Sequence, residues 1–173
     1  MSDIQEDFDS KFVTSVGLIT SNGKKWGPNV MAAEWTMQIS YDPPLIAVFI
    51  HPGDVTHENI LESKEFGVNM VTDDQAPLSH LAGTVSKRYY DKLSDEHFKD
   101  KTYPAKKINV LMIKGCTINA ECKLIFYKDL GDHTMFVGEV VAASYDDSKK
   151  PILYHFHRYF KVGEHIEKPK RKS

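Results

Sequence analysis

The sequence predicts one mainly β domain, either a β-barrel or an α+β fold, with a few short helices. Segments rich in β-branched and aromatic residues, bounded by Gly, Pro, Asn or Asp, outnumber the helical ones. The helical patterns are short and show no regular β-α-β alternation, which argues against a doubly wound sheet. The 173 residues suffice for a single domain with a full core, so we assign residues 1–173 to one domain.

The strand prediction is clearest over residues 116–126, where the pattern has a period of two. One face of this segment is apolar, with Cys116, Ile118, Ala120, Cys122, Leu124 and Phe126. The other face is polar, with Thr117, Asn119, Glu121 and Lys123. Such alternation is typical of a half-buried strand in an antiparallel sheet or barrel. The other expected strands cover residues 12–20, 45–50, 66–71, 108–113 and 135–144.

Three short helices are expected between these strands. Thr56 is a suitable N-cap for a helix over residues 57–63, with Glu58 in its first turn. Residues 76–81 suggest a second helix and residues 93–99 a third.

Charge and composition exclude several classes of partner. The net charge of −2 predicts no general attraction to nucleic acid or to an anionic membrane. The chain has an acidic lead-in (residues 1–10) and a basic tail (residues 166–173), and the basic cluster of residues 168–172 is expected to be solvated. The start lacks the apolar core of a signal peptide, and no apolar run approaches the roughly 20 residues that cross a bilayer, which predicts a cytoplasmic protein. Cys116 and Cys122 are expected to be buried, reduced thiols.

Most standard chemical motifs are missing. The chain has no GxGxxG, GxxxxGK[ST], GxSxG, HExxH or CxxC pattern. His155 and His157 are expected on one face of a strand, with His51, His133 or His165 as third ligands, but the carboxylate that usually completes such a site is absent. No metal site is therefore predicted.

Three features of the sequence suggest a binding site, and two of them, at Thr56 and His133, allow a second interpretation. Residues 29–40, NVMAAEWTMQIS, follow no simple period, which a segment built only for packing would keep. The helix start at Thr56 suits either a phosphate or only its own cap. His133, after the probable turn at Gly131 and Asp132, is either a ligand-orienting group or a turn residue.

Four segments together resemble the flavin reductase-like, FMN-binding split-barrel family. Residues 27–50, GPNVMAAEWTMQISYDPPLIAVFI, resemble its N-V-M-A-A-S-W segment and the P-P-L-V-A-V that follows. Residues 51–71 resemble its T-x-x-x-I helix and E-F-x-V-N strand, and residues 131–141, GDHTMFVGEVV, its G-D-H-x-x-F-x-G-E-V element. Residues 151–164, PILYHFHRYFKVGE, resemble its closing segment. The four occur in the family's order.

The resemblance implies a six-stranded antiparallel split barrel, a homodimer, and FMN bound near the dimer interface. It implies NADH or NADPH as electron donor, with free flavin or a redox protein as acceptor. Flavin reductase activity and flavoredoxin-type electron carriage both remain open. A ferric-chelate reductase, or a non-enzymatic or haem-binding split barrel, is the alternative.

The resemblance also assigns roles to individual residues. The backbone at the edge of the flavin ring would belong to Asn29, Val30, Met31 and Ala32. Trp35, Thr36 and Ser40 match positions near the ribityl chain and phosphate, and Thr56 would help to hold the phosphate. Ser86 and Lys92 match an S-x-x-x-x-D-K element that approaches the flavin, and His133 would position nicotinamide.

The chain departs from the family pattern at three places. Glu34 replaces a common Ser, and we expect its carboxylate to point away from FMN or to pair with a cation. Lys87 replaces a Gly. Phe156 and His157 replace a Gly-Gly pair, and their bulk is expected to narrow access to the flavin.

Overall fold

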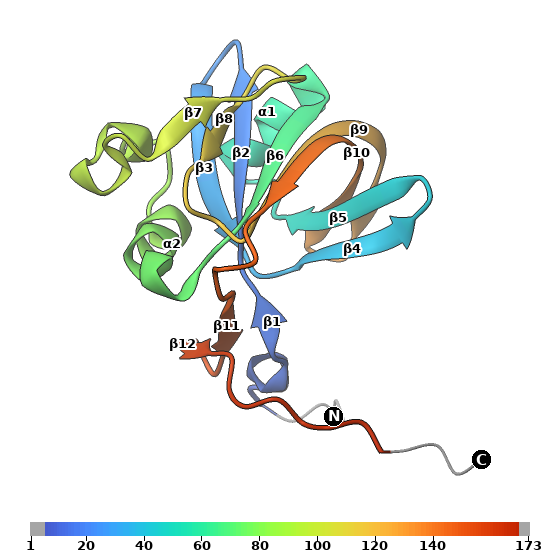
Figure 1. Cartoon of the computed structure of the whole chain (residues 1–173). Helices are drawn as coiled ribbons and strands as arrows, with labels where there is room; N and C mark the ends of the chain where they lie inside the picture. The colour runs from blue at the N-terminus through green and yellow to red at the C-terminus, as the bar shows by residue number, and fades with distance from the viewer. Residues whose placement is uncertain (1–5, 170–173) are drawn as a thin grey trace.

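The structure, a computed structural model, describes residues 6–169 and confirms a mainly β fold (Figure 1). Its largest sheet is antiparallel, in the order β3-β2-β6-β9-β10-β5-β4. The strands are β2 (Gly17–Gly23), β3 (Gly27–Ala33), β4 (Thr36–Tyr41), β5 (Pro44–Ile50), β6 (Glu65–Met70), β9 (Ile118–Leu130) and β10 (His133–Tyr145). Within the described residues this sheet has seven strands, one more than the resemblance implied. The sheet curls without pairing its edges, so the barrel is open.

The two edges of the sheet, β3 and β4, are consecutive in the chain. Glu34 and Trp35 connect them, and the carbonyl of Trp35 accepts a hydrogen bond from the Phe49 amide of β5 at 3.1 Å. Residues 29–40 are therefore two strands on opposite edges of one sheet. This break explains why the segment follows no simple period.

A small sheet joins the two ends of the described chain. It pairs β1 (Thr14–Ser15) with β11 (Ile152–His155), which pairs in turn with β12 (Arg158–Lys161). The turn of this hairpin is formed by Phe156 and His157, with φ of 48° and 57°. His157 thus lies in a turn, so the expectation that it shares a strand face with His155 was wrong.

A two-stranded sheet of β7 (Thr102–Pro104) and β8 (Leu111–Ile113) covers β6 and β2. The predicted strand over residues 108–113 is thus realised only in its last three residues. Of the predicted polar face of β9, Glu121 is only 6% exposed, because its carboxylate accepts hydrogen bonds from the amides of Lys106 and Lys107 in the loop before β8. On the predicted apolar face, Ile118 and Phe126 are 43% and 49% exposed. The alternation therefore holds only in the middle of the strand.

Two α-helices flank the large sheet, α1 (Val55–Ser63) and α2 (Ala76–Thr84). The N-cap of α1 is Asp54, so the predicted cap at Thr56 was wrong by two residues. The third expected helix is replaced by two 3-10 turns, Lys92–Ser94 and Glu96–Phe98. Further 3-10 turns cover Asp9–Lys11 and Asp73–Gln75. No helix among the described residues is long and apolar enough to cross a membrane.

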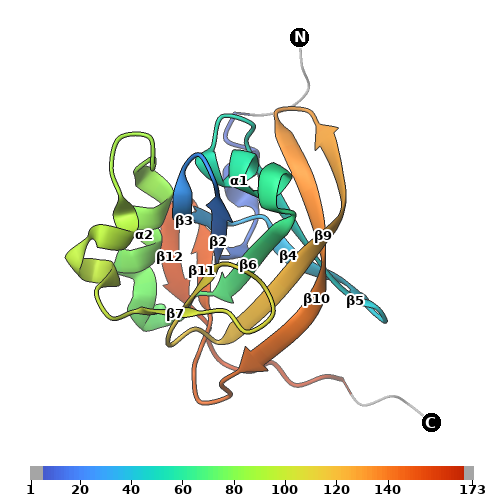
Figure 2. The same ribbon diagram turned by 90° about the horizontal axis from the view of Figure 1, so that it is seen from above.

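The core has two main parts. One fills the curled sheet and includes Ile19, Val48, Ile60, Phe66 and Phe136. The other lies between the large sheet, α2 and the C-terminal hairpin, and includes Leu18, Val30, Ala82, Phe98 and Ile152. Figure 2 shows α2 beside β3, with β11 and β12 close by. This second part holds one edge of the sheet against α2, where the cavities described below occur.

The two cysteines are buried and free, as predicted. Burial raises the pKa of each thiol to about 12, so neither is ionised at neutral pH. Parts of two predicted segments, residues 1–5 and 170–173, lie outside the described residues. In the described remainders, residues 6–9 and 166–169 are exposed, whereas Ser10 is buried.

Candidate functional site

A cavity of about 400 Å³ lies between β3, the start of α1 and the segment that follows α2. We call it the lysine cavity. The residues predicted from the sequence that line it are Asn29, Met31, Ala32, Thr56, Ser86 and Lys92. The remaining lining residues are Asp54, Val55, Ala82, Gly83, Thr84, Val85 and Lys87. The structure thus brings together six predicted site residues from three distant segments of the chain.

Lys92 is the most unusual group in this cavity, because it is a lysine that is only 3% exposed. Its ammonium donates a hydrogen bond to the carbonyl of Ala82 at 3.1 Å. Burial lowers the pKa of Lys92 to about 8; Asp54 opposes this shift and Lys87 adds to it. A buried ammonium with only a carbonyl for a partner is costly unless an anion completes it. This end of the cavity therefore favours an anionic ligand.

Lys87 supplies a second ammonium, held 2.6 Å from the carboxylate of Asp91. Its side chain is largely buried. Burial alone would raise the pKa of Asp91, but the hydrogen bond and charge of Lys87 lower it. The Gly that the family pattern has at this position would supply neither the side chain nor the charge.

Asn29 contributes an unsatisfied acceptor. It is 3% exposed, and its amide nitrogen donates to the Thr56 hydroxyl oxygen at 2.9 Å. Its side-chain oxygen has no hydrogen-bond partner among the described residues. Buried polar atoms are nearly always paired, and this covered oxygen is an exception beside the cavity.

The segment that carries these lysines is fastened to the start of α1 by Arg88. Its guanidinium donates to the carbonyl of Gly53 at 3.1 and 3.3 Å and pairs with the carboxylate of Glu58. Hydrogen bonds from Trp26, Arg88 and Lys25 lower the pKa of Glu58 to about 2. This ionised network holds the segment that carries Lys87 and Lys92 against the start of α1, so the two walls of the lysine cavity keep a fixed relative position.

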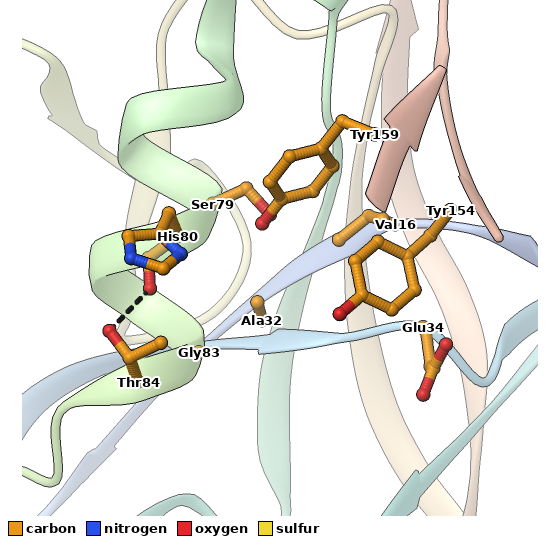
Figure 3. Close-up of a pocket in the computed structure, with 9 residues that line it drawn as sticks. All are labelled: Val16, Ala32, Glu34, Ser79, His80, Gly83, Thr84, Tyr154 and Tyr159. Atoms are coloured by element: carbon orange, nitrogen blue, oxygen red, sulfur yellow. Dashed lines mark hydrogen bonds between the residues drawn. The ribbon is translucent and has the colours of Figure 1, made fainter. Parts of the chain in front are cut away.

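Past Ala32 the cleft continues into three smaller cavities of about 200, 200 and 30 Å³, all lined by Glu34. We call them together the aromatic chamber. Its rings belong to Trp35, Phe49, Tyr154, Phe156 and Tyr159, with Phe12 and five histidines. Figure 3 shows Tyr154 and Tyr159 projecting toward α2 and Ala32, with Glu34 near Tyr154. Because Gly83 lies so close to Ala32 that an added Cβ would be 3.3 Å from the Ala32 methyl, a side chain there would narrow the passage.

Glu34 is exposed and accepts a hydrogen bond from the Thr14 hydroxyl at 3.3 Å. Among the described residues no Lys, Arg or His lies within ion-pair distance of it, so the expected cation partner is not found there. The carboxylate lines the aromatic chamber and not the lysine cavity. That its carboxylate points away from FMN stays a prediction.

His133 lines the aromatic chamber beside Trp35. The two ring centroids are 4.8 Å apart, and the ring of His51 lies 5.9 Å away. The Nδ1 atom of His133 is 2.8 Å from the carboxylate of Asp132, and this hydrogen bond lowers the pKa of Asp132. The bond fixes the ring's orientation and leaves Nε2 available to a ligand.

Four residues predicted at the flavin do not bring their side chains to the lysine cavity, and one of them, Trp35, lines the aromatic chamber instead. Val30 is fully buried in the core, and Thr36 donates its hydroxyl to the Ala33 carbonyl. Ser40 lies on β4, the opposite edge of the sheet. A backbone role for Val30 remains a prediction. Sequence reasoning missed Asp54, Ser79 and Tyr159. Asp54 and Tyr159 lie in segments that resemble the family, whereas Ser79 carried no signal.

A further cavity of about 470 Å³ lies on the far side of the barrel. We call it the apolar cavity. Its lining is dominated by Met37, Leu45, Ile46, Val68, Met70, Ile118, Ala120 and Val140. Nearby on β4, Ile39 and Tyr41 are exposed. Elsewhere the described residues contain no group of three or more His, Cys, Asp or Glu side chains placed to hold a metal ion.

An open antiparallel barrel with short helices is the fold of flavin reductase-type split barrels. The chain belongs to the family described as flavin reductase like domain, whose model matches residues 9–163. The predicted resemblance is therefore confirmed.

Two relatives and one solved structure illustrate the likeness. The chain is 30% identical to FMN reductase (NADH) SmoA of Agrobacterium fabrum, over 79% of this chain and 72% of that protein. It is 29% identical to a ferric-chelate reductase (NAD(P)H) of Archaeoglobus fulgidus, over 91% and 92%. The crystal structure of an FMN-binding protein from Thermus thermophilus matches in fold, with a TM-score of 0.85, 24% identity, and coverage of 98% and 97%.

Proposed function

We propose that the protein binds FMN in the lysine cavity and acts as an NAD(P)H-dependent flavin oxidoreductase. The observation that carries this proposal is the meeting of Lys92, Ser86 and Thr56 with β3 around one cavity of about 400 Å³. A cavity of this size holds a ligand of cofactor dimensions. The family, and the FMN reductase among the relatives, supply the chemical class.

The phosphate of FMN would bind between Lys87, Lys92, Ser86 and the first backbone amides of α1. The free N–H groups at a helix start and two ammonium groups all favour an anion there. The backbone of residues 29–32 would follow the ring edge, where its amides can donate to the heteroatoms that gain electron density on reduction. Bound FMN would supply the two-electron acceptor chemistry that the side chains lack.

The nicotinamide would enter from the aromatic chamber. His133, with its ring fixed by Asp132, would position nicotinamide through Nε2 without transferring a proton in the hydride step. The chamber adjoins the lysine cavity, because Met31, Ala32 and Asp54 line both. A small residue here leaves room for a ring near the β3 backbone.

A visible spectrum with and without nicotinamide tests this proposal. The purified protein is saturated with FMN, and its flavin absorbance is followed without oxygen after addition of NADH or NADPH. We expect stoichiometric FMN uptake and rapid bleaching with one or both nicotinamides. Failure to take up FMN overturns the proposal, and a Soret band would indicate a haem protein instead. Bleaching only with dithionite or a reduced partner protein would indicate an electron carrier.

The His133→Ala variant tests the role of the histidine. We expect the KM for nicotinamide to rise about tenfold, through the loss of one positioning contact, while FMN stays bound. His165→Ala, in the exposed C-terminal segment, is the control and should leave both unchanged. Release of FMN from His133→Ala would place His133 in the flavin site.

Ferric-chelate reduction is the second candidate, favoured by the relative that matches over most of both chains. A reduced flavin passes electrons to metal chelates with little help from protein, so this activity needs no iron site. Steady-state rates with free FMN and with a ferric chelate as acceptors distinguish the two activities.

We also propose that the protein is a homodimer in which a second copy covers the apolar cavity. Exposed Met37, Ile39 and Tyr41 beside this cavity are large apolar groups that an isolated chain would leave in water. Sedimentation should show a dimer, and Met37→Asp should shift it to a monomer. A monomeric wild-type protein would overturn this assignment.

A further inference from the structure

The two ends of the cleft carry opposite charges. The lysine cavity contains Lys87 and Lys92. No described residue that lines the aromatic chamber is a Lys or Arg, and its carboxylates belong to Asp9, Glu34 and Asp54. Asp54 lies at the boundary and lines both regions. A ligand that enters the chamber therefore meets negative charge, whereas one in the lysine cavity meets positive charge.

Glu34 is the carboxylate at the centre of the chamber, because it lines all three of its cavities. The described residues offer it one hydrogen bond, from Thr14, and no cation. Burial first, and the negative charge of Glu34 second, raise the pKa of Tyr154, which is consistent with the carboxylate acting on the chamber wall. The Glu34 carboxylate can therefore form an ion pair with a cationic ligand.

Aromatic rings surround this carboxylate. Trp35, Tyr154 and Phe156 line the same small cavity as Glu34. The ring of Phe156 already attracts a cation on one side, since the Lys11 ammonium lies 4.3 Å from its centroid. Aromatic faces attract cations, and a carboxylate among aromatic rings is a recurrent way to recognise a flat or methylated cation. The composition of the chamber matches that pattern.

We propose that Glu34, with Trp35, Tyr154 and Phe156, forms a binding site for a flat organic cation of the pyridinium class. This inference rests on the proposed function. A dihydronicotinamide is uncharged at its ring, but when its C4 passes a hydride, one proton with two electrons, to the flavin, the ring becomes a pyridinium cation. Glu34 would then interact more strongly with the ring as the charge develops than with the neutral donor. Interactions that strengthen toward the transition state are the ones that accelerate a reaction.

The test uses 1-methylnicotinamide, a pyridinium cation, and nicotinamide, its uncharged counterpart of almost the same shape. Binding of each to the FMN-loaded protein is measured by calorimetry in the wild type, in Glu34→Gln and in the matched control Glu96→Gln. Glu96 is exposed on a 3-10 turn and does not line the chamber. Flavin absorbance of the same samples reports FMN loading independently.

We expect Glu34→Gln to weaken 1-methylnicotinamide about tenfold, because a nearby unit charge is lost from a partly screened site. Nicotinamide affinity should stay unchanged, and Glu96→Gln should match the wild type for both probes. Added salt should weaken the cation in the wild type and not in Glu34→Gln. Equal losses for both probes, or no loss for the cation, in protein that still binds FMN would overturn the inference and leave the proposed function standing. Absence of FMN uptake would overturn the proposed function on which the inference rests.

Discussion

The lysine cavity and the aromatic chamber share Ala32 and Asp54, yet they are built in different ways. The lysine cavity has walls held by an ionised network of Arg88, Glu58 and Trp26, and its key ammonium is buried. The aromatic chamber is lined by exposed or half-buried rings from the break between the sheet edges and from a hairpin near the C-terminus. The difference matches the proposed function, in which the buried, charged end would hold the FMN phosphate and the exposed aromatic end would admit nicotinamide.

The variant with the largest expected effect on this comparison is Lys92→Met. Met keeps the length of the side chain and removes the charge, so we expect FMN affinity to fall by about 2–3 kcal/mol through loss of a charge-assisted hydrogen bond. Equilibrium titration of flavin fluorescence measures the change. Because the variant no longer buries an ammonium, its thermal stability without FMN should not fall. Lys99→Met, at an exposed position, is the control.

The pH dependence of FMN binding should change with Lys92 as well. Burial lowers the pKa of Lys92 to about 8 from the ordinary 10.5, so its charge is lost as pH rises through about 8. FMN affinity should therefore fall about tenfold between pH 7 and 9.5, and the fall should be smaller in Lys92→Met. The stability of the FMN-free protein should change in the opposite direction as pH rises. Between about pH 8 and 10.5 the unfolded chain binds more protons, so the free energy of unfolding rises.

At the aromatic end, the hairpin turn offers a sharper test. Phe156 and His157 both have positive φ, a conformation that glycine adopts without cost and that other side chains rarely adopt. Replacing both with Gly, as in the family pattern, should raise the free energy of unfolding by about 1 kcal/mol and open the chamber. Chemical denaturation measures the first effect, and the KM for nicotinamide the second. A destabilised double variant would show that packing of these side chains outweighs the backbone strain.

The smallest expected effect is that of Thr56→Ala. Thr56 is fully buried and accepts a hydrogen bond from Asn29, so its loss should act through the position of Asn29. We expect FMN affinity to fall by about 1 kcal/mol, with Thr56→Ser retaining most of it. An unchanged affinity would show that the Asn29–Thr56 hydrogen bond does not contribute to FMN binding.

Much of the fold followed from local patterns, and the errors have physical causes. Strands at β5, β6 and β10 were predicted within two residues, because their β-branched runs end at turn residues. β3 and β4 were not recognised as strands, since an edge strand beside a cleft need not alternate. Glu121 was placed on a solvent face, and its burial depends on backbone amides of a distant loop that no local pattern indicates.

The candidate site was predicted mainly through the family resemblance, which pointed to Asn29, Thr56 and Lys92 in separate segments. The residues alone did not show that these segments meet. The residues 34 and 156–157, where this chain departs from the family pattern, all line the aromatic chamber. The charge difference between the two ends is a property of the folded chain. It depends on which wall the lysines line and from which wall lysines and arginines are absent.

The most direct test of the central claim is the affinity of the protein for FMN compared with riboflavin, which lacks only the phosphate. If the lysine cavity holds the phosphate, FMN should bind about 100-fold more tightly than riboflavin, and Lys92→Met should remove most of that difference. Equal affinities of the wild type for the two flavins would contradict the account, because the buried ammonium would then hold no part of the cofactor.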